Sequence, residues 1–169
     1  MNGLSRRGFL ASAAVASAAL ASGRAEAATV PLLLHDAGLA AGRRFAARAQ
    51  VLGGKAMALE GDRVRQMRAL LSASPAAIFA ITRRSDELLV GEIATEAGYR
   101  RIALVRHGAD GRMAARCTAD GASVHALAQL SGVAWPEAFA DLALDRIGQC
   151  AIAPDSSVTP ALSWVMIRR

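Results

Sequence analysis

The sequence predicts an α/β fold with three layers, in which helices cover both faces of a mainly parallel sheet. Three observations support this prediction. Short apolar runs recur along residues 30–107, each is followed by a segment with the apolar period of a helix, and the connections are short. Strands that alternate with helices in this way are typical of a parallel sheet with helices on both faces.

The first two strand and helix units cover residues 30 to 75. Residues 30–34 (VPLLL) form an apolar run without helical period, which predicts a buried strand. Residues 38–52 place apolar side chains on one helical face, with arginines opposite and a Gly-Gly pair at the end. Residues 55–59 predict a second strand, after which Asp62 caps a helix that Pro75 stops.

The third unit has the clearest signals. Residues 76–81 (AAIFAI) predict a buried strand, and Ser85 is the expected N-cap of a helix that runs to Ala97. Two acidic residues fall in the first turn, where the helix dipole favours them, and Gly98 stands where a C-terminal cap is expected. Residues 101–105 (RIALV) predict the fourth strand.

Beyond the fourth strand the pattern changes, and turn residues lead into an expected antiparallel edge strand at 113–118. Helices are predicted for residues 123–130 and from Pro136 onward. A last strand at 162–167 (LSWVMI) is apolar on both faces, as in a covered strand. Its expected partner is residues 150–153, so the prediction includes an antiparallel C-terminal edge.

Residues 1–27 have the layout of an export signal. Arg6 and Arg7 precede a mildly apolar run at residues 9–21, which is too short to cross a hydrocarbon core of roughly 30 Å. The triplet Ala25-Glu26-Ala27 has the small-x-small form that signal peptidase reads. The predicted organisation is therefore a leader at residues 1–27 and a single α/β domain at 28–169.

The stretch SRRGFL around Arg6 and Arg7 resembles the twin-arginine (Tat) signal peptides of bacteria, apart from an alanine where a lysine often follows. This resemblance covers only the leader. It implies a periplasmic or secreted protein that engages the Tat translocon and crosses the membrane already folded. Such cargo often carries a cofactor or a co-exported partner protein.

Composition and motifs exclude several classes of protein. The formal net charge is +6, but Lys55 is the sole lysine and the arginines are spread out, which argues against nucleic-acid binding. No second apolar stretch reaches membrane-spanning length, so we expect no stable membrane anchor. No GxxxxGK[ST] or GxGxxG motif is present, and we predict no cofactor.

The two cysteines, Cys117 and Cys150, leave two interpretations open. An oxidising destination favours a disulfide between them, whereas folding in a reducing cytoplasm before export favours two buried thiols. No CxxC, HxxxH or HxxE spacing accompanies them, so a metal site is not predicted.

Polar residues gather where the predicted parallel strands end, and ligands of open α/β sheets bind at that carboxyl edge. The turn at residues 82–85 combines hydroxyls, helix-start amides and arginines that suit an anion. A simple capping role for Ser85 beside solvated arginines is the alternative. The candidate ligand-binding residues are Asp62, Thr82, Arg83, Arg84, Ser85 and Arg106.

Catalysis is a second possibility at the same edge. The candidate catalytic residues are His35, Asp36 and His107. His35 with Asp36, or His107 with Asp110, would supply a general base and the carboxylate that orients it, and Ser85 would be a nucleophile. No GxSxG motif supports this, and histidines at strand ends more often serve as simple hydrogen-bonding residues.

Two aromatic residues at helical spacing, Trp135 and Phe139, fit either a core stripe or a surface for a partner protein, and the core is favoured.

The strand and helix alternation over residues 30–107 resembles flavodoxin-like domains and halves of periplasmic-binding-protein-like folds, and such a likeness has no functional meaning by itself. No family is recognised for the domain. The leading hypothesis is a small exported binding or accessory protein, more a binder than an enzyme, with a small anionic ligand at the carboxyl edge. The alternatives are a periplasmic hydrolase that uses a strand-end histidine, and an interaction partner of another exported enzyme.

Overall fold

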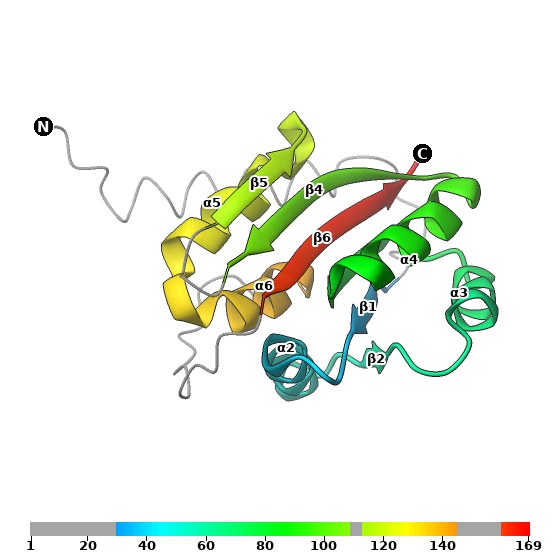
Figure 1. Ribbon diagram of the computed structural model, residues 1–169, viewed down its shortest axis with the longest axis horizontal. Coiled ribbons are helices and arrows are strands. Elements are labelled where there is room, and N and C mark those ends of the chain that lie inside the picture. The colour runs from blue at the N-terminus through cyan, green and yellow to red at the C-terminus, as the bar shows by residue number, and fades with distance from the viewer. Residues whose placement is uncertain (1–29, 109–112, 145–159) are drawn as a thin grey trace, which may run out of the picture.

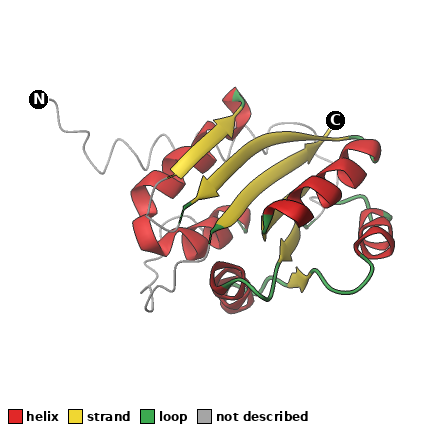
Figure 2. Ribbon diagram, viewed as in Figure 1, coloured by secondary structure: helices red, strands yellow, loops and turns green. Residues whose placement is uncertain are grey.

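A computed structural model describes residues 30–108, 113–144 and 160–169. These residues form one mixed sheet of six strands, and helices pack on both of its faces (Figures 1 and 2). No helix of the described ranges is long and apolar enough to cross a membrane. The leader, the strand expected at 150–153 and Cys150 lie outside these ranges.

The strands follow the order β2-β1-β3-β6-β4-β5 across the sheet. β1 pairs in parallel with both β2 and β3, whereas the pairs β3–β6, β6–β4 and β4–β5 are antiparallel. The first four strands therefore point the same way, as their alternation with helices predicts. The strands are β1 (Leu32–His35), β2 (Ala56–Ala58), β3 (Ala77–Thr82), β4 (Tyr99–His107), β5 (Met113–Cys117) and β6 (Ala161–Arg168).

The position of β6 differs most from the expectation. The sequence predicts this strand at an antiparallel edge, but it lies between β3 and β4 and hydrogen-bonds to both. The sheet is consequently mixed rather than mainly parallel. The apolar residues on both faces of β6 explain the central position, because only an inner strand covered by helices buries both faces. The antiparallel edge strand is β5, as predicted for residues 113–118.

Two separate apolar layers hold the helices to the sheet. One contains Phe45, Phe79 and Phe139 and lies under α2, α5 and α6. The other contains Met67, Val90 and Trp164 and lies under α3 and α4, and Figure 1 shows α4 across that face. The helices are α2 (Ala40–Val51), α3 (Arg63–Leu71), α4 (Arg84–Glu96), α5 (Ala122–Ser131) and α6 (Trp135–Ala143).

The helix starts confirm one predicted cap and correct another. The Asp62 carboxylate accepts a hydrogen bond from the Arg65 amide, so it caps α3 as expected. Ser85 is not the N-cap of α4, because the helix begins at Arg84 and Arg83 occupies the cap position without a side-chain hydrogen bond. The early start follows from β3, which continues to Thr82 and leaves a single residue as connection.

Two arginines of α2, expected on its solvated face, instead bind α6. Arg44 pairs with both carboxylate oxygens of Glu137, each at 2.6 Å, and Arg48 pairs with Asp141 at 2.7 and 3.3 Å. All four side chains are largely buried. The two residues of each helix are four positions apart, so the two bidentate pairs lie one turn apart. This spacing is the feature of the sequence that indicates the pairs.

We expect Arg44→Ala to lower the free energy of unfolding by about 2–3 kcal/mol, because the largely buried Glu137 loses its bidentate partner. The double variant Arg44→Leu/Glu137→Leu should lie within about 1 kcal/mol of the wild type, since no buried charge remains unpaired. Urea denaturation measures both, with Arg68→Ala on exposed α3 surface as the control. Equal losses in the single and double variants would contradict this explanation.

Candidate functional site

The carboxyl ends of β1 and β3 form the point of the sheet where the chain direction splits. The loop after β1 leads to α2 on one face, and the loop after β3 leads to α4 on the other. Open α/β sheets bind their ligands at such a switch point, in the crevice outside the ends of the two strands. Both helices point their N-termini toward this edge, because each follows a strand that ends there.

An ion pair joins the loops that follow β1 and β3. Asp36, directly after β1, accepts a hydrogen bond from Arg83 Nε at 2.5 Å through one oxygen, and from the Gly38 amide at 2.8 Å through the other. The Asp36 side chain is 9% exposed, whereas that of Arg83 is 52% exposed. A Cβ atom on Gly38 would lie 2.8 Å from Arg83 Nη2, so this glycine leaves room for the guanidinium. The pair orients Arg83 and leaves much of its side chain open to solvent.

The acidic residues in the first turn of α4 are neutralised by partners from other elements. Asp86 pairs with Arg63 of α3 at 3.4 Å, and the buried Glu87 lies 2.6 Å from Arg101 Nη2 on β4. Gly91 makes the second contact possible, because a Cβ there would stand 2.8 Å from the same Arg101 nitrogen. Because both carboxylates are paired, they cancel little of the positive partial charge that the helix dipole places at the start of α4.

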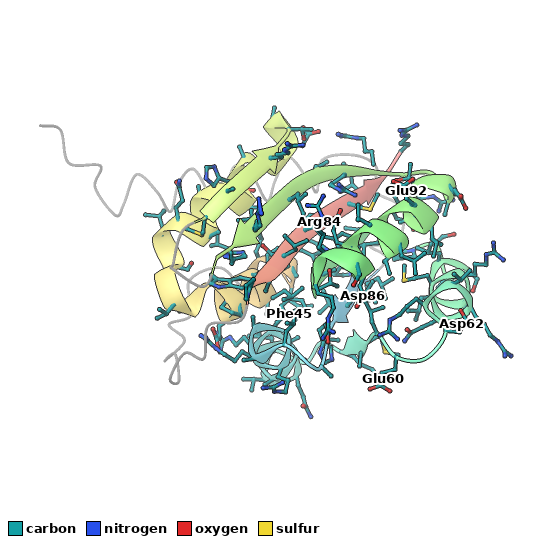
Figure 3. The ribbon with its side chains drawn as sticks, in the orientation of Figure 1. Phe45, Glu60, Asp62, Arg84, Asp86 and Glu92 are labelled. Carbon is teal, nitrogen blue, oxygen red and sulfur yellow. The ribbon has the colours of Figure 1, made fainter. Side chains whose placement is uncertain are left out.

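The structure separates the remaining predicted ligand residues. Arg84 and Ser85 are exposed in the first turn of α4, next to Arg83, and Figure 3 shows Arg84 and Asp86 near the start of this helix. Asp62 lies on the loop that leads from β2 to α3. Thr82 is fully buried, and its hydroxyl accepts a hydrogen bond from Trp164 at 3.0 Å, so it cannot contact a ligand.

The end of β4 forms a site of its own, because β6 lies between it and β3. Here His107 Nε2 lies 2.8 Å from the hydroxyl of Ser163 on β6, and its ring stacks on Trp135 with centroids 3.5 Å apart. His107 and Ser163 are 6% and 1% exposed. Arg106, the adjacent candidate, is exposed, and strand alternation turns its side chain to the opposite face.

The distance between this histidine and serine suits a general base and a nucleophile, but their burial and hydrogen bonding do not. Ser163 is closed to substrate, and His107 Nδ1 is buried with no hydrogen-bond partner among the described residues, so none of their carboxylates orients the ring. An unpaired buried N–H is costly, which favours the tautomer whose Nε2–H donates to Ser163 Oγ. In that form the ring cannot take the serine proton. The sequence signal for Ser163 is its place as the one polar residue in LSWVMI.

His35 and Asp36 do not form the expected catalytic pair. Neighbouring residues of an extended chain point to opposite sides, so Asp36 turns to Arg83 and Gly38 while His35 lies on the α2 face. His35 Nδ1 is buried and has no hydrogen-bond partner in the described part of the chain. Burial lowers the pKa of His35, and the nearby carboxylates of Asp36 and Glu60 oppose that shift.

The predicted aromatic pair lies mainly in the core. Phe139 is 2% exposed and contacts Phe45 and Phe79, with ring centroids 5.5 and 5.6 Å away. Trp135 is half-buried against His107. The prediction of a core stripe is therefore confirmed for Phe139, and a surface for a partner protein stays a prediction.

The disulfide stays a prediction, whereas the alternative of two buried thiols is wrong for Cys117. Cys117 is exposed on edge strand β5, and Cys150, its proposed partner, falls outside the described residues. Asp110, the expected carboxylate beside His107, does so too. Among residues 30–108, 113–144 and 160–169, no group of three or more His, Cys, Asp or Glu side chains is arranged to hold a metal ion.

Comparisons of the chain with protein-family models, curated proteins and solved structures give no significant match. The functional conclusion therefore depends on the geometry of the site.

Burial of His107 lowers its pKa from 6.5 to about 4, so we expect the protein to lose stability on acidification. Between pH 6.5 and 4 the unfolded chain takes up a proton that the folded chain excludes, and the loss reaches about 2 kcal/mol by pH 5. Above pH 6.5 this contribution to stability is complete.

Urea denaturation of the wild type and of His107→Gln at pH 7.5 and pH 5 isolates this loss from that of other groups. The variant should lose less stability than the wild type, and parallel losses in both proteins would show that His107 is not responsible.

Proposed function

We propose that the protein is an exported binding protein whose ligand is a small anion held in the crevice between β1 and β3. The observation that carries the proposal is the Asp36–Arg83 ion pair across this crevice, with Arg83 half exposed beside the start of α4. Arg83 supplies a planar, permanently charged fork that suits carboxylates and phosphates. Asp36 acts as a positioning residue for it.

Two helix N-termini reinforce this choice of ligand charge. α2 has 12 residues and α4 has 13, and in neither does a described side chain cap the first turn. Their first backbone amides lack helical acceptors, so they favour an anion at this edge. Arg84 and Ser85, exposed in the first turn of α4, add a second charge and a hydroxyl.

The local strand order also supports a ligand at this place. Flavodoxin-like folds have the order 2-1-3 around the crevice between strands 1 and 3, and they bind their ligand there. The present sheet has the same order over β2, β1 and β3 and departs from it where β6 follows. The likeness is one of architecture, and the choice of an anion depends on Arg83.

We expect inorganic phosphate, sulfate or a small carboxylate to raise the Tm of the protein in thermal unfolding. A ligand at ten times its Kd adds about 1.4 kcal/mol, which corresponds to a shift of roughly 4–6 °C for a domain of this size. Arg83→Gln should abolish the shift, and Arg83→Lys should keep part of it, because it keeps the charge but not the fork.

The matched control is Arg68→Gln, which removes an exposed arginine of α3 far along the chain from the crevice. It should respond to anions like the wild type. A wild type that no anion of this panel stabilises, or an Arg83→Gln variant that is stabilised equally, would falsify the proposal.

The export part of the proposal rests on the leader alone. We expect the double change Arg6→Lys/Arg7→Lys to stop appearance of the protein outside the cytoplasm, since twin-arginine signals are read by a receptor. Immunoblots of periplasmic and cytoplasmic fractions measure this. Unchanged export of the double variant would show that the protein does not use the twin-arginine translocon.

A further inference from the structure

A hollow lies between α2 and the edge strand β2. Its volume is about 650 Å³, within the usual range for sites of small molecules. The lining residues come from one side of α2, from the start of β2 and from the end of β1: Arg43, Ala46, Ala47, Gln50, Lys55 and His35 among them.

Small side chains create the hollow. Ala46 and Ala47 face it from α2, and Ala56 faces it from β2, so helix and strand do not fill the space between them. β2 is a short edge strand of three residues with β1 as its sole neighbour in the sheet. The resulting walls are apolar and suit a short hydrocarbon group.

The polar groups around these walls are mostly donors. Arg43 is held toward the loop after β1 by a 2.8 Å hydrogen bond from Nη1 to the Ala37 carbonyl, and Lys55 is exposed at the opposite rim. His35 is 9% exposed, and its Nδ1 is sealed without a partner, so Nε2 is the nitrogen that it can offer to the hollow. The exposed Glu60 and the paired Asp36 are the carboxylates near His35.

A neutral imidazole at this position fits the surroundings. The tautomer that avoids a buried, unpaired N–H at Nδ1 carries its hydrogen on Nε2 and donates it into the hollow. Two cationic side chains and one N–H donor then line the same hollow as the alanines.

We propose that this hollow is a second binding site, which takes a small organic anion with a short aliphatic part, its carboxylate or phosphate ester held by His35, Arg43 and Lys55. The site differs from the β1/β3 crevice, because it uses neither Arg83 nor the start of α4, although the loop after β1 borders both. Its selectivity differs as well, since the alanine walls favour an organic anion over an inorganic one.

NMR spectra of the histidine side chains test the proposal, with sodium butyrate, propyl phosphate, inorganic phosphate and butylammonium as probes. We expect butyrate or propyl phosphate to shift the His35 ring signals saturably, and the one that binds identifies the head group. Inorganic phosphate should bind more weakly at His35, and butylammonium should leave the ring unchanged.

Two exposed substitutions separate binding from folding. Ala47→Leu fills the hollow without touching a polar group and should weaken binding about tenfold or more, or roughly 1.4 kcal/mol. Lys55→Gln removes one charge and should weaken it about threefold to tenfold. Arg83→Gln should leave the affinity for the organic anion, measured from the His35 ring signals, unchanged. Failure of one site is then distinguishable from failure of the other.

The proposal is overturned if neither organic anion shifts His35 saturably, or if butylammonium shifts it equally. It is also overturned if Ala47→Leu and Lys55→Gln, folded by circular dichroism, bind the anion as the wild type does.

Discussion

The continuity of the sheet depends on β6. This strand hydrogen-bonds to β3 on one side and to β4 on the other, so it joins the parallel unit of β2, β1 and β3 to the β4–β5 hairpin. It also contributes to both apolar layers, with Val165 on one face and Trp164 and Met166 on the other. The same insertion separates the ends of β3 and β4. His107 therefore lies with Ser163 and Trp135 rather than with Arg83, and the polar edge is divided into distinct sites.

Much of the fold is predictable from the sequence, because local period and turn residues carry it. The parallel unit, the β5 edge strand and the Asp62 cap all follow from segments of a few residues. The position of β6 depends on pairing with strands far away in the sequence, which local patterns do not predict. Its two apolar faces indicated only that it is an inner strand. The location of a residue at a strand end also does not predict which side chain it contacts. Asp36 and Arg83 meet across 47 positions of sequence, and the sequence suggested each of them but not the pair.

The two acidic residues in the first turn of α4 do not oppose the anion proposed there, because their charges are neutralised. Arg63 and Arg101 come from other elements and take up the charges of Asp86 and Glu87. The role of these carboxylates is then structural, because they fix α4 against α3 and β4. Arg83 is bound to Asp36 through Nε, and much of its side chain is exposed. The local balance of charge in the crevice is set by tertiary contacts and not by the order of residues along the helix.

The Arg44–Glu137 and Arg48–Asp141 pairs have a consequence for how two helices keep their alignment. Both pairs advance in the same direction along α2 and α6, so the helices run the same way and their charged positions repeat every turn. A slide of α6 by one turn would bring Glu137 opposite Arg48 and preserve one of the two contacts. Electrostatics alone therefore defines the alignment poorly. The ring of Phe139 lies between Phe45 and Phe79, and the same slide would put the larger indole of Trp135 in its place. The space between these rings fits a phenyl ring, so the size of the aromatic side chain, and not the charge pattern, distinguishes the two registers.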